Sequence, residues 1–148
     1  MRKLFATGND FTLAFARLIL GCVFFAHGAQ KVLGLFGGAG FSATLNMFTG
    51  YLHIPMPLAV LAIVTEFLAG LGLIVGLLSR VAALGIVSIM LVAIVKVHIH
   101  MGFFANWTGT QKGEGIEYHL LAIALAVLIM VKGTGALSFD RALSKPKA

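Results

Sequence analysis

Charged residues and cysteine are both scarce in this sequence. Of its 148 residues only 11% are Asp, Glu, Lys or Arg, whereas 59% are hydrophobic. Because a soluble domain carries about 25% charged residues, this composition argues against a soluble protein and indicates a lipid bilayer as the solvent. The single cysteine, Cys22, cannot form an intramolecular disulfide, and one cysteine is too few for a C-x-x-C redox pair.

The charge that remains is mostly basic, and the net charge is +6. In a soluble protein such a balance would suggest nucleic acid as a partner. Here the basic residues lie at the ends of apolar runs and in the tails, which is typical of membrane helices whose flanks face anionic lipid headgroups. We therefore expect the lipid bilayer, and not nucleic acid, as the partner.

Four stretches are predicted to cross the membrane as helices, namely residues 11–35, 57–78, 81–104 and 116–135. A crossing needs about 20 largely apolar residues. The second stretch is the clearest, because Glu66 is its only charge. The sequence thus predicts one all-α domain over residues 1–148, an integral membrane four-helix transmembrane bundle. A short interfacial helix is expected at 41–48 in the first outer link, and a basic C-terminal tail at 138–148.

The distribution of Lys and Arg predicts the orientation of this bundle. With four crossings both termini lie on one side, together with the short Ser79-Arg80 turn. That side holds eight basic residues and the other holds three, so the termini are expected in the cytoplasm. Small residues let membrane helices approach closely, and we expect the glycines at 21, 28, 72 and 76 to pack within the bundle rather than between two copies of it.

Polar side chains from all four predicted helices fall in one layer near the outer face. By the rise of a helix they lie roughly 5 to 13 Å below the outer boundary. An ionised group deep in a bilayer costs about 2.5 to 3.5 kcal/mol, so these groups are expected to face each other or a hydrated pocket. The candidates are His27, Lys31, Glu66, Lys96, His98, His100, Glu117 and Tyr118.

Helical spacing predicts which of these side chains share a face. His27 and Lys31 are four residues apart, as are Lys96 and His100, and such pairs lie on one side of a helix. His98 is two residues from each member of the second pair, so it is expected to point elsewhere.

Several interpretations of the polar layer stay open. Glu66 with a lysine is either a structural ion pair or part of a ligand site, and Arg17 is expected to snorkel or pair. His53 and His119 are expected to be interfacial residues that water satisfies. Donors and acceptors at the edge of an apolar slot suit a quinone headgroup, but also other amphipathic ligands. No ligand spacing indicates haem or a metal, and no residue is assigned a catalytic role.

Two segments resemble the DoxX family of bacterial membrane proteins. They are Arg17-Leu18-Ile19-Leu20-Gly21 and His27-Gly28-Ala29-Gln30-Lys31, and the acid at Glu66 and the Glu117-Tyr118-His119 segment look similar too. The resemblance spans residues 12–137 and implies a four-helix protein of the inner membrane. It also implies a polar pocket lined by His27, Lys31, Glu66 and Glu117, and relatives that include a subunit of a thiosulfate:quinone oxidoreductase.

Three functional hypotheses follow. The first is a membrane subunit of an oxidoreductase system that binds a quinone or similar ligand; lacking a redox motif, it would need another membrane or redox subunit as partner. The second is a non-enzymatic assembly or binding protein. The third is a small proton-coupled transporter acting as a homo-oligomer, with Glu66 as the coupling acid. The sequence carries no self-sufficient catalytic motif, so it leaves open whether the chain is an enzyme.

Overall fold

The computed structural model describes residues 2–144, and within that range the chain is helical without strands. Two of the helices, η1 and η2, are π-helices. The elements are α1 (Arg2–Phe5), α2 (Phe11–Leu33), α3 (Gly40–Asn46), η1 (Met47–Tyr51), α4 (Met56–Val75), α5 (Ser79–Ala93), η2 (Ile94–His98), α6 (Glu117–Lys132) and α7 (Phe139–Ser144).

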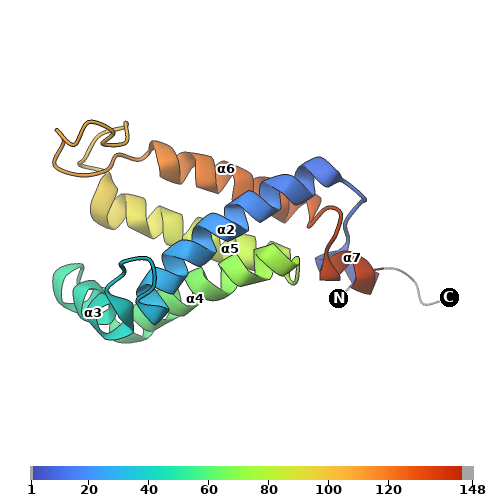
Figure 1. Cartoon of the computed structure of the whole chain (residues 1–148), viewed down its shortest axis with the longest axis horizontal. Coiled ribbons are helices and arrows are strands. Elements are labelled where there is room, and N and C mark those ends of the chain that lie inside the picture. The colour runs from blue at the N-terminus through green and yellow to red at the C-terminus, as the bar shows by residue number, and fades with distance from the viewer. Residues whose placement is uncertain (1, 145–148) are drawn as a thin grey trace.

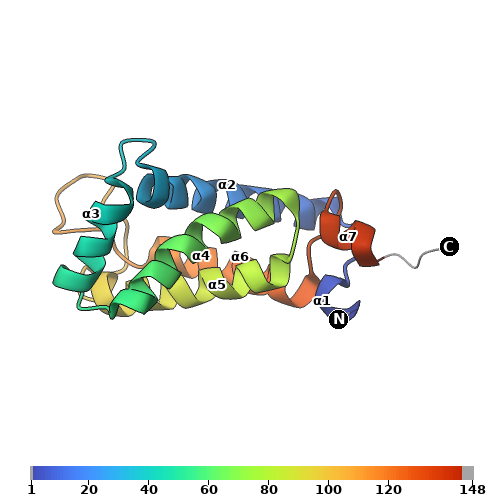
Figure 2. The same cartoon turned by 90° about the horizontal axis from the view of Figure 1, so that it is seen from below.

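The helices α2, α4, α5 and α6 lie side by side in one elongated bundle (Figures 1 and 2). The helix α2 packs most extensively on α4, α5 packs on both α4 and α6, and α2 touches α6 less. We call the end that carries α1, α7 and the α4–α5 turn the closed end. The end that carries α3, η1, η2 and the loop of residues 99–116 is the open end.

Among residues 2–144, three helices are long and apolar enough to cross a membrane: Phe11–Leu33, Met56–Val75 and Ser79–His98. The all-helical membrane prediction is therefore confirmed. The fourth helix, α6, has 16 residues, fewer than the 20 predicted for 116–135. The helices α2 and α4 also end before the predicted residues 35 and 78. Each is followed by a glycine in the left-handed conformation, Gly34 at φ 70° and Gly76 at φ 71°, which ends the helix.

Large apolar side chains point outward from all four bundle helices. Patches of this extent are uncommon on soluble monomers, and hydrocarbon chains of lipid are their natural solvent. Among the exposed residues are Phe11, Phe15 and Ile19 on α2, Leu61 and Leu68 on α4, Leu84 and Leu91 on α5, and Leu121 and Val131 on α6.

Glycines allow α2 and α4 to cross at backbone contact. A Cβ atom on Gly28 would lie 2.4 Å from the Cα of Phe67, and one on Gly70 would lie 2.3 Å from the backbone nitrogen of Phe25. Gly21 meets the same helix, so the expected packing of Gly21 and Gly28 within the bundle is confirmed. Gly76 instead ends α4, where a Cβ would meet Ser138.

Arg17 holds the closed end together from inside the bundle. Its guanidinium is fully buried and donates to the carbonyl oxygens of Leu73, Ile74 (3.0 Å) and Leu137 (3.1 Å). The carbonyls in the last turn of a helix lack partners within the helix, so this cation caps α4 and binds the C-terminal segment. Arg17 thus neither snorkels to water nor pairs with an acid, because carbonyl oxygens already surround it.

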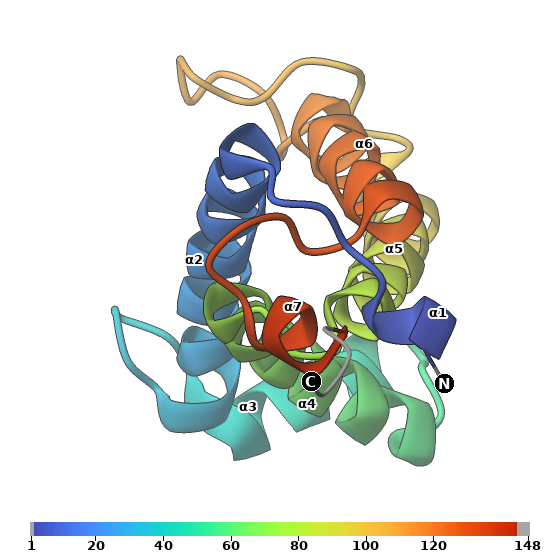
Figure 3. The same ribbon diagram turned by 90° about the vertical axis from the view of Figure 1, so that its right-hand side faces the viewer.

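Arg80 repeats the arrangement on the other half of the bundle. It donates to the carbonyls of Met130 and Val131 (3.0 Å) in the last turn of α6, and to the carbonyl of Ala6 (3.0 Å) before α2. In each of the two helix pairs, an arginine of the first helix therefore caps the C-terminal end of the second: Arg17 of α2 caps α4, and Arg80 of α5 caps α6. Figure 3 shows the two terminal segments lying across this end.

Part of the segment predicted as a basic tail, residues 138–148, is helical, and residues 145–148 lie outside the described range. Phe139–Ser144 form α7, in which Asp140 is fully buried. Its carboxylate accepts hydrogen bonds from the backbone nitrogens of Leu78 (2.7 Å) and Ser79 (3.0 Å), so it caps the start of α5. The segment that contains α7 therefore folds back onto the bundle, because its Asp140 caps α5.

Candidate functional site

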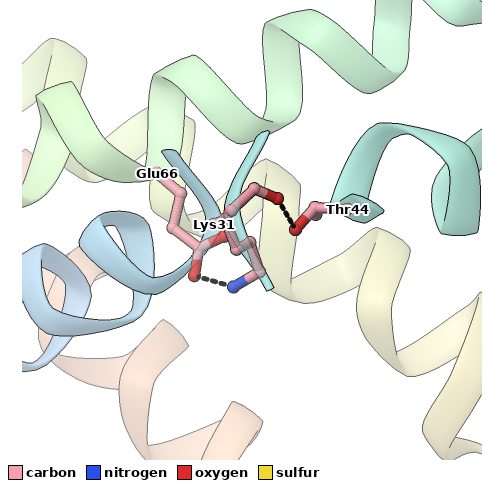
Figure 4. Close-up of polar contacts among 4 residues, drawn as sticks. Lys31, Thr44 and Glu66 are labelled. Carbon is pink, nitrogen blue, oxygen red and sulfur yellow. Dashed lines mark hydrogen bonds and ion pairs between the residues drawn. The ribbon is translucent and has the colours of Figure 1, made fainter. Parts of the chain in front are cut away.

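An ion pair between Lys31 and Glu66 joins α2 to α4. The Nζ of Lys31 is 2.6 Å from an Oε of Glu66, and the exposed fractions of the two side chains are 26% and 6%. Figure 4 shows the pair with Thr44 of α3 nearby; the Thr44 hydroxyl donates to the carbonyl of Gly40. This is the one ion pair in the described part of the chain.

The glycine crossing places this pair. Because Gly28 touches the backbone of Phe67, the next turn of α2 presents Lys31 to the residue just before Phe67, which is Glu66. His27 lies one turn before Lys31 on the same face. A crossing that only a glycine permits therefore brings an acid and a base of separate helices into contact.

Two aromatic contacts extend the cluster to η2 and α6. The rings of His98 and His119 lie with centroids 4.1 Å apart, and the ring of Tyr118 lies 6.2 Å from that of His27. The Nδ1 of His98 is 2.7 Å from the carbonyl oxygen of Glu114. The Nδ1 of His119 is buried without a hydrogen-bond partner.

These groups line one cavity of about 1230 Å³, which we call the polar pocket. Its walls are mostly apolar side chains of α4, α5 and the link before α4. This combination of an apolar wall with a few convergent polar groups is typical of small-molecule sites. Its titratable or aromatic polar side chains are His27, Lys31, His53, Glu66, Lys96, His98, Trp107, Glu114, Tyr118 and His119.

Six of the eight candidates named from the sequence line this pocket: His27, Lys31, Glu66, Lys96, His98 and Tyr118. Glu117 does not; its carboxylate accepts from the backbone nitrogen of Ala105 (2.8 Å) and from the indole of Trp107 (3.4 Å), and so fixes the loop before α6.

His100 is also outside the pocket, whereas His98 lines it, which reverses the expectation for this helix. The segment Ile94–His98 is a π-helix, in which hydrogen bonds join residues five apart. One such bond runs from the backbone nitrogen of Ile99 to the carbonyl of Ile94 (2.8 Å). The four-residue spacing that predicted a shared face for Lys96 and His100 does not apply there.

Sequence reasoning missed four of these pocket residues, namely His53, Trp107, Glu114 and His119. His119 was expected to be an interfacial residue satisfied by water, but it is buried against His98. The sequence did carry a signal for His119, because it is adjacent to the candidate Tyr118 at the start of α6. Trp107 lines the mouth of the pocket while remaining largely exposed.

No group of three or more His, Cys, Asp or Glu side chains among residues 2–144 is arranged to hold a metal ion. What the pocket offers is hydrogen-bond donors and acceptors: a lysine paired with a carboxylate, a second lysine, imidazoles and a phenol. These features define a helical membrane protein with a polar pocket inside its bundle.

The chain belongs to the DoxX family. The family model for DoxX matches residues 12–99, which is more than half of the chain. The match includes the ion pair as well as His27, Lys96 and His98, and it ends before the loop and α6. No curated protein and no solved structure matches the chain.

Proposed function

We propose that this protein is a membrane subunit that binds a quinone, or a similar amphipathic molecule with a compact polar head, for an oxidoreductase partner. The observation that carries the proposal is the polar pocket, in which polar groups from α2, α4, η2 and α6 meet at the end of an apolar cavity of about 1230 Å³.

The chemistry of the lining suits the carbonyl oxygens of a quinone ring. The Lys31 ammonium, the Tyr118 hydroxyl and the imidazoles of His27 and His98 supply donors from several directions. Glu66 keeps Lys31 oriented through the 2.6 Å contact. The lone cysteine offers no dithiol chemistry, so electrons reach the bound ring from a partner subunit, and the protein itself supplies binding and orientation.

The proposed membrane arrangement extends the three apolar helices to four crossings. The helix α6 covers about 24 Å, and the buried residues 133–136 continue the crossing at the closed end. The closed end lies in the cytoplasm with both termini, and the membrane is the bacterial inner membrane. The polar pocket then faces outward, and α3 lies in the outer interface.

The sole tryptophan provides the test, because Trp107 lines the pocket mouth. Protein in nanodiscs is titrated with decylubiquinone while the emission of Trp107 is recorded. We expect saturable quenching in the wild type. In the double variant Lys31→Met/Glu66→Leu we expect an apparent Kd at least tenfold higher, because the polar head contacts are gone.

The variant His100→Ala is the matched control, since this histidine lies near His98 but outside the pocket. Its Kd should stay within twofold of the wild type. Quenching that does not saturate, or an unchanged Kd in the double variant, contradicts quinone binding and favours an assembly protein. Loss of proton uptake in Glu66→Gln vesicles without quinone binding would favour the transporter.

A further inference from the structure

The polar pocket is not confined to the interior of the bundle. Part of its lining is buried, including Phe24, Glu66 and Met90. Another part consists of large apolar side chains on the outer surface, including Leu61 and Leu84. One cavity therefore runs from the buried polar groups to the outer face of the bundle.

The outward part is a groove between α4 and α5. The residues that line it from these helices are Leu58, Leu61, Ala62 and Thr65 on α4, and Val81, Leu84, Gly85, Ser88, Ile89 and Val92 on α5. From Val81 to Val92 it extends about 16 Å along α5. Gly85 makes this approach possible, because a Cβ there would lie 2.6 Å from the Cγ2 of Thr65.

We infer that the α4–α5 groove holds the hydrocarbon tail of the ligand and is the route by which the ligand enters sideways from the bilayer. The inference rests on the proposed function and adds the class of ligand: a small polar head on a long apolar tail. The polar groups fix the head, and the groove is continuous with them. A single cavity that has a polar part and an apolar part fits one molecule that has a polar head and an apolar tail.

A lateral route is favoured physically because it keeps the hydrocarbon tail of the ligand in lipid or in the groove, and out of water. Lipid is as apolar as the groove, so a tail that stays between α4 and α5 never has to cross water while its head reaches Lys31. A mouth that opened only to the aqueous side would expose the whole tail to water during binding, and the free-energy cost of that exposure grows with each methylene group.

A second outer groove exists between α2 and α6, but it suits a tail less well. Its volume is about 160 Å³, and it is lined by Leu20, Val23, Leu121 and other apolar residues together with Tyr118. Tyr118 also lines the polar pocket. This groove is therefore the competing route that an experiment must distinguish.

The first experiment locates the tail by cross-linking. Wild-type protein in nanodiscs is irradiated with a ubiquinone analogue that carries a diazirine at the end of a ten-carbon tail, and the labelled peptides are mapped by mass spectrometry. We expect labels on residues 81–92 of α5 or 58–65 of α4, competed by excess decylubiquinone. Labels on Leu121 or Leu125 of α6 would overturn the assignment.

The second experiment fills the groove. Leu84→Trp places a large ring in it, whereas Leu128→Trp makes the same change at an exposed position of α6 that lines neither cavity. We expect competed labelling to fall at least tenfold in Leu84→Trp and less than twofold in Leu128→Trp. Equal labelling in both variants would refute the groove as the tail site.

The outcomes separate the two proposals. If the wild type takes up the probe but the label lies outside the α4–α5 groove, quinone binding stands and the tail assignment fails. If the wild type shows no labelling that decylubiquinone competes, both fail.

Discussion

The ion pair between Lys31 and Glu66 predicts an asymmetric response to mutation. The Glu66 side chain is 6% exposed and that of Lys31 is 26% exposed. Lys31→Met leaves a carboxylate buried without its cation, which should cost about 3 kcal/mol of unfolding free energy. Glu66→Gln leaves a lysine whose long stem can carry the ammonium toward the pocket mouth, so we expect a cost of about 1 kcal/mol.

The double variant tests the reasoning behind these magnitudes. Replacing both partners with apolar side chains of similar volume is often neutral, so Lys31→Met/Glu66→Leu should unfold within about 1 kcal/mol of the wild type. The assay is SDS-induced unfolding in bicelles, followed by circular dichroism. A double variant as unstable as Lys31→Met, or a Lys31→Met protein as stable as the wild type, would refute the account of the pair.

Two further changes test the helix crossing and the closed end in the same assay. Gly28→Ala pushes a Cβ into the backbone at Phe67 and should cost about 2 kcal/mol, whereas Gly50→Ala, with open space around it, should change stability by less than about 0.5 kcal/mol; equal effects would argue against the tight crossing. Asp140→Ala removes the cap on two amides of α5 and the 2.8 Å contact with Thr134, and should cost about 2 kcal/mol. A neutral Asp140→Ala would mean that α7 does not hold the bundle.

Hydropathy and helical spacing predict a large part of this fold. Three of the apolar runs in the sequence correspond to three long helices of the structure. They could be predicted because a run of about 20 residues with very few charges is typical of a membrane helix. The spacing of His27 and Lys31 predicts their common face, and the scarcity of acids leaves Glu66 as the natural partner. These inferences depend on local pattern and on the cost of burying charge.

The remaining features depend on tertiary position, which local pattern does not encode. Arg17 and Arg80 bind carbonyl groups at helix ends more than 45 residues away in the chain, and Asp140 caps a helix that begins about 60 residues before it. The π-helix at Ile94–His98 changed which histidine lines the pocket. A spacing rule based on α-helix geometry could not anticipate that change.

The most direct measurement of the central claim is to identify what the protein carries out of the membrane. Wild type, His100→Ala and Lys31→Met/Glu66→Leu proteins are purified side by side, and their lipophilic ligands are extracted and quantified by mass spectrometry. The account predicts a quinone near one per chain in the first two and at most a tenth of that in the double variant. A folded wild type without quinone, or the same quinone content in all three proteins, would contradict it.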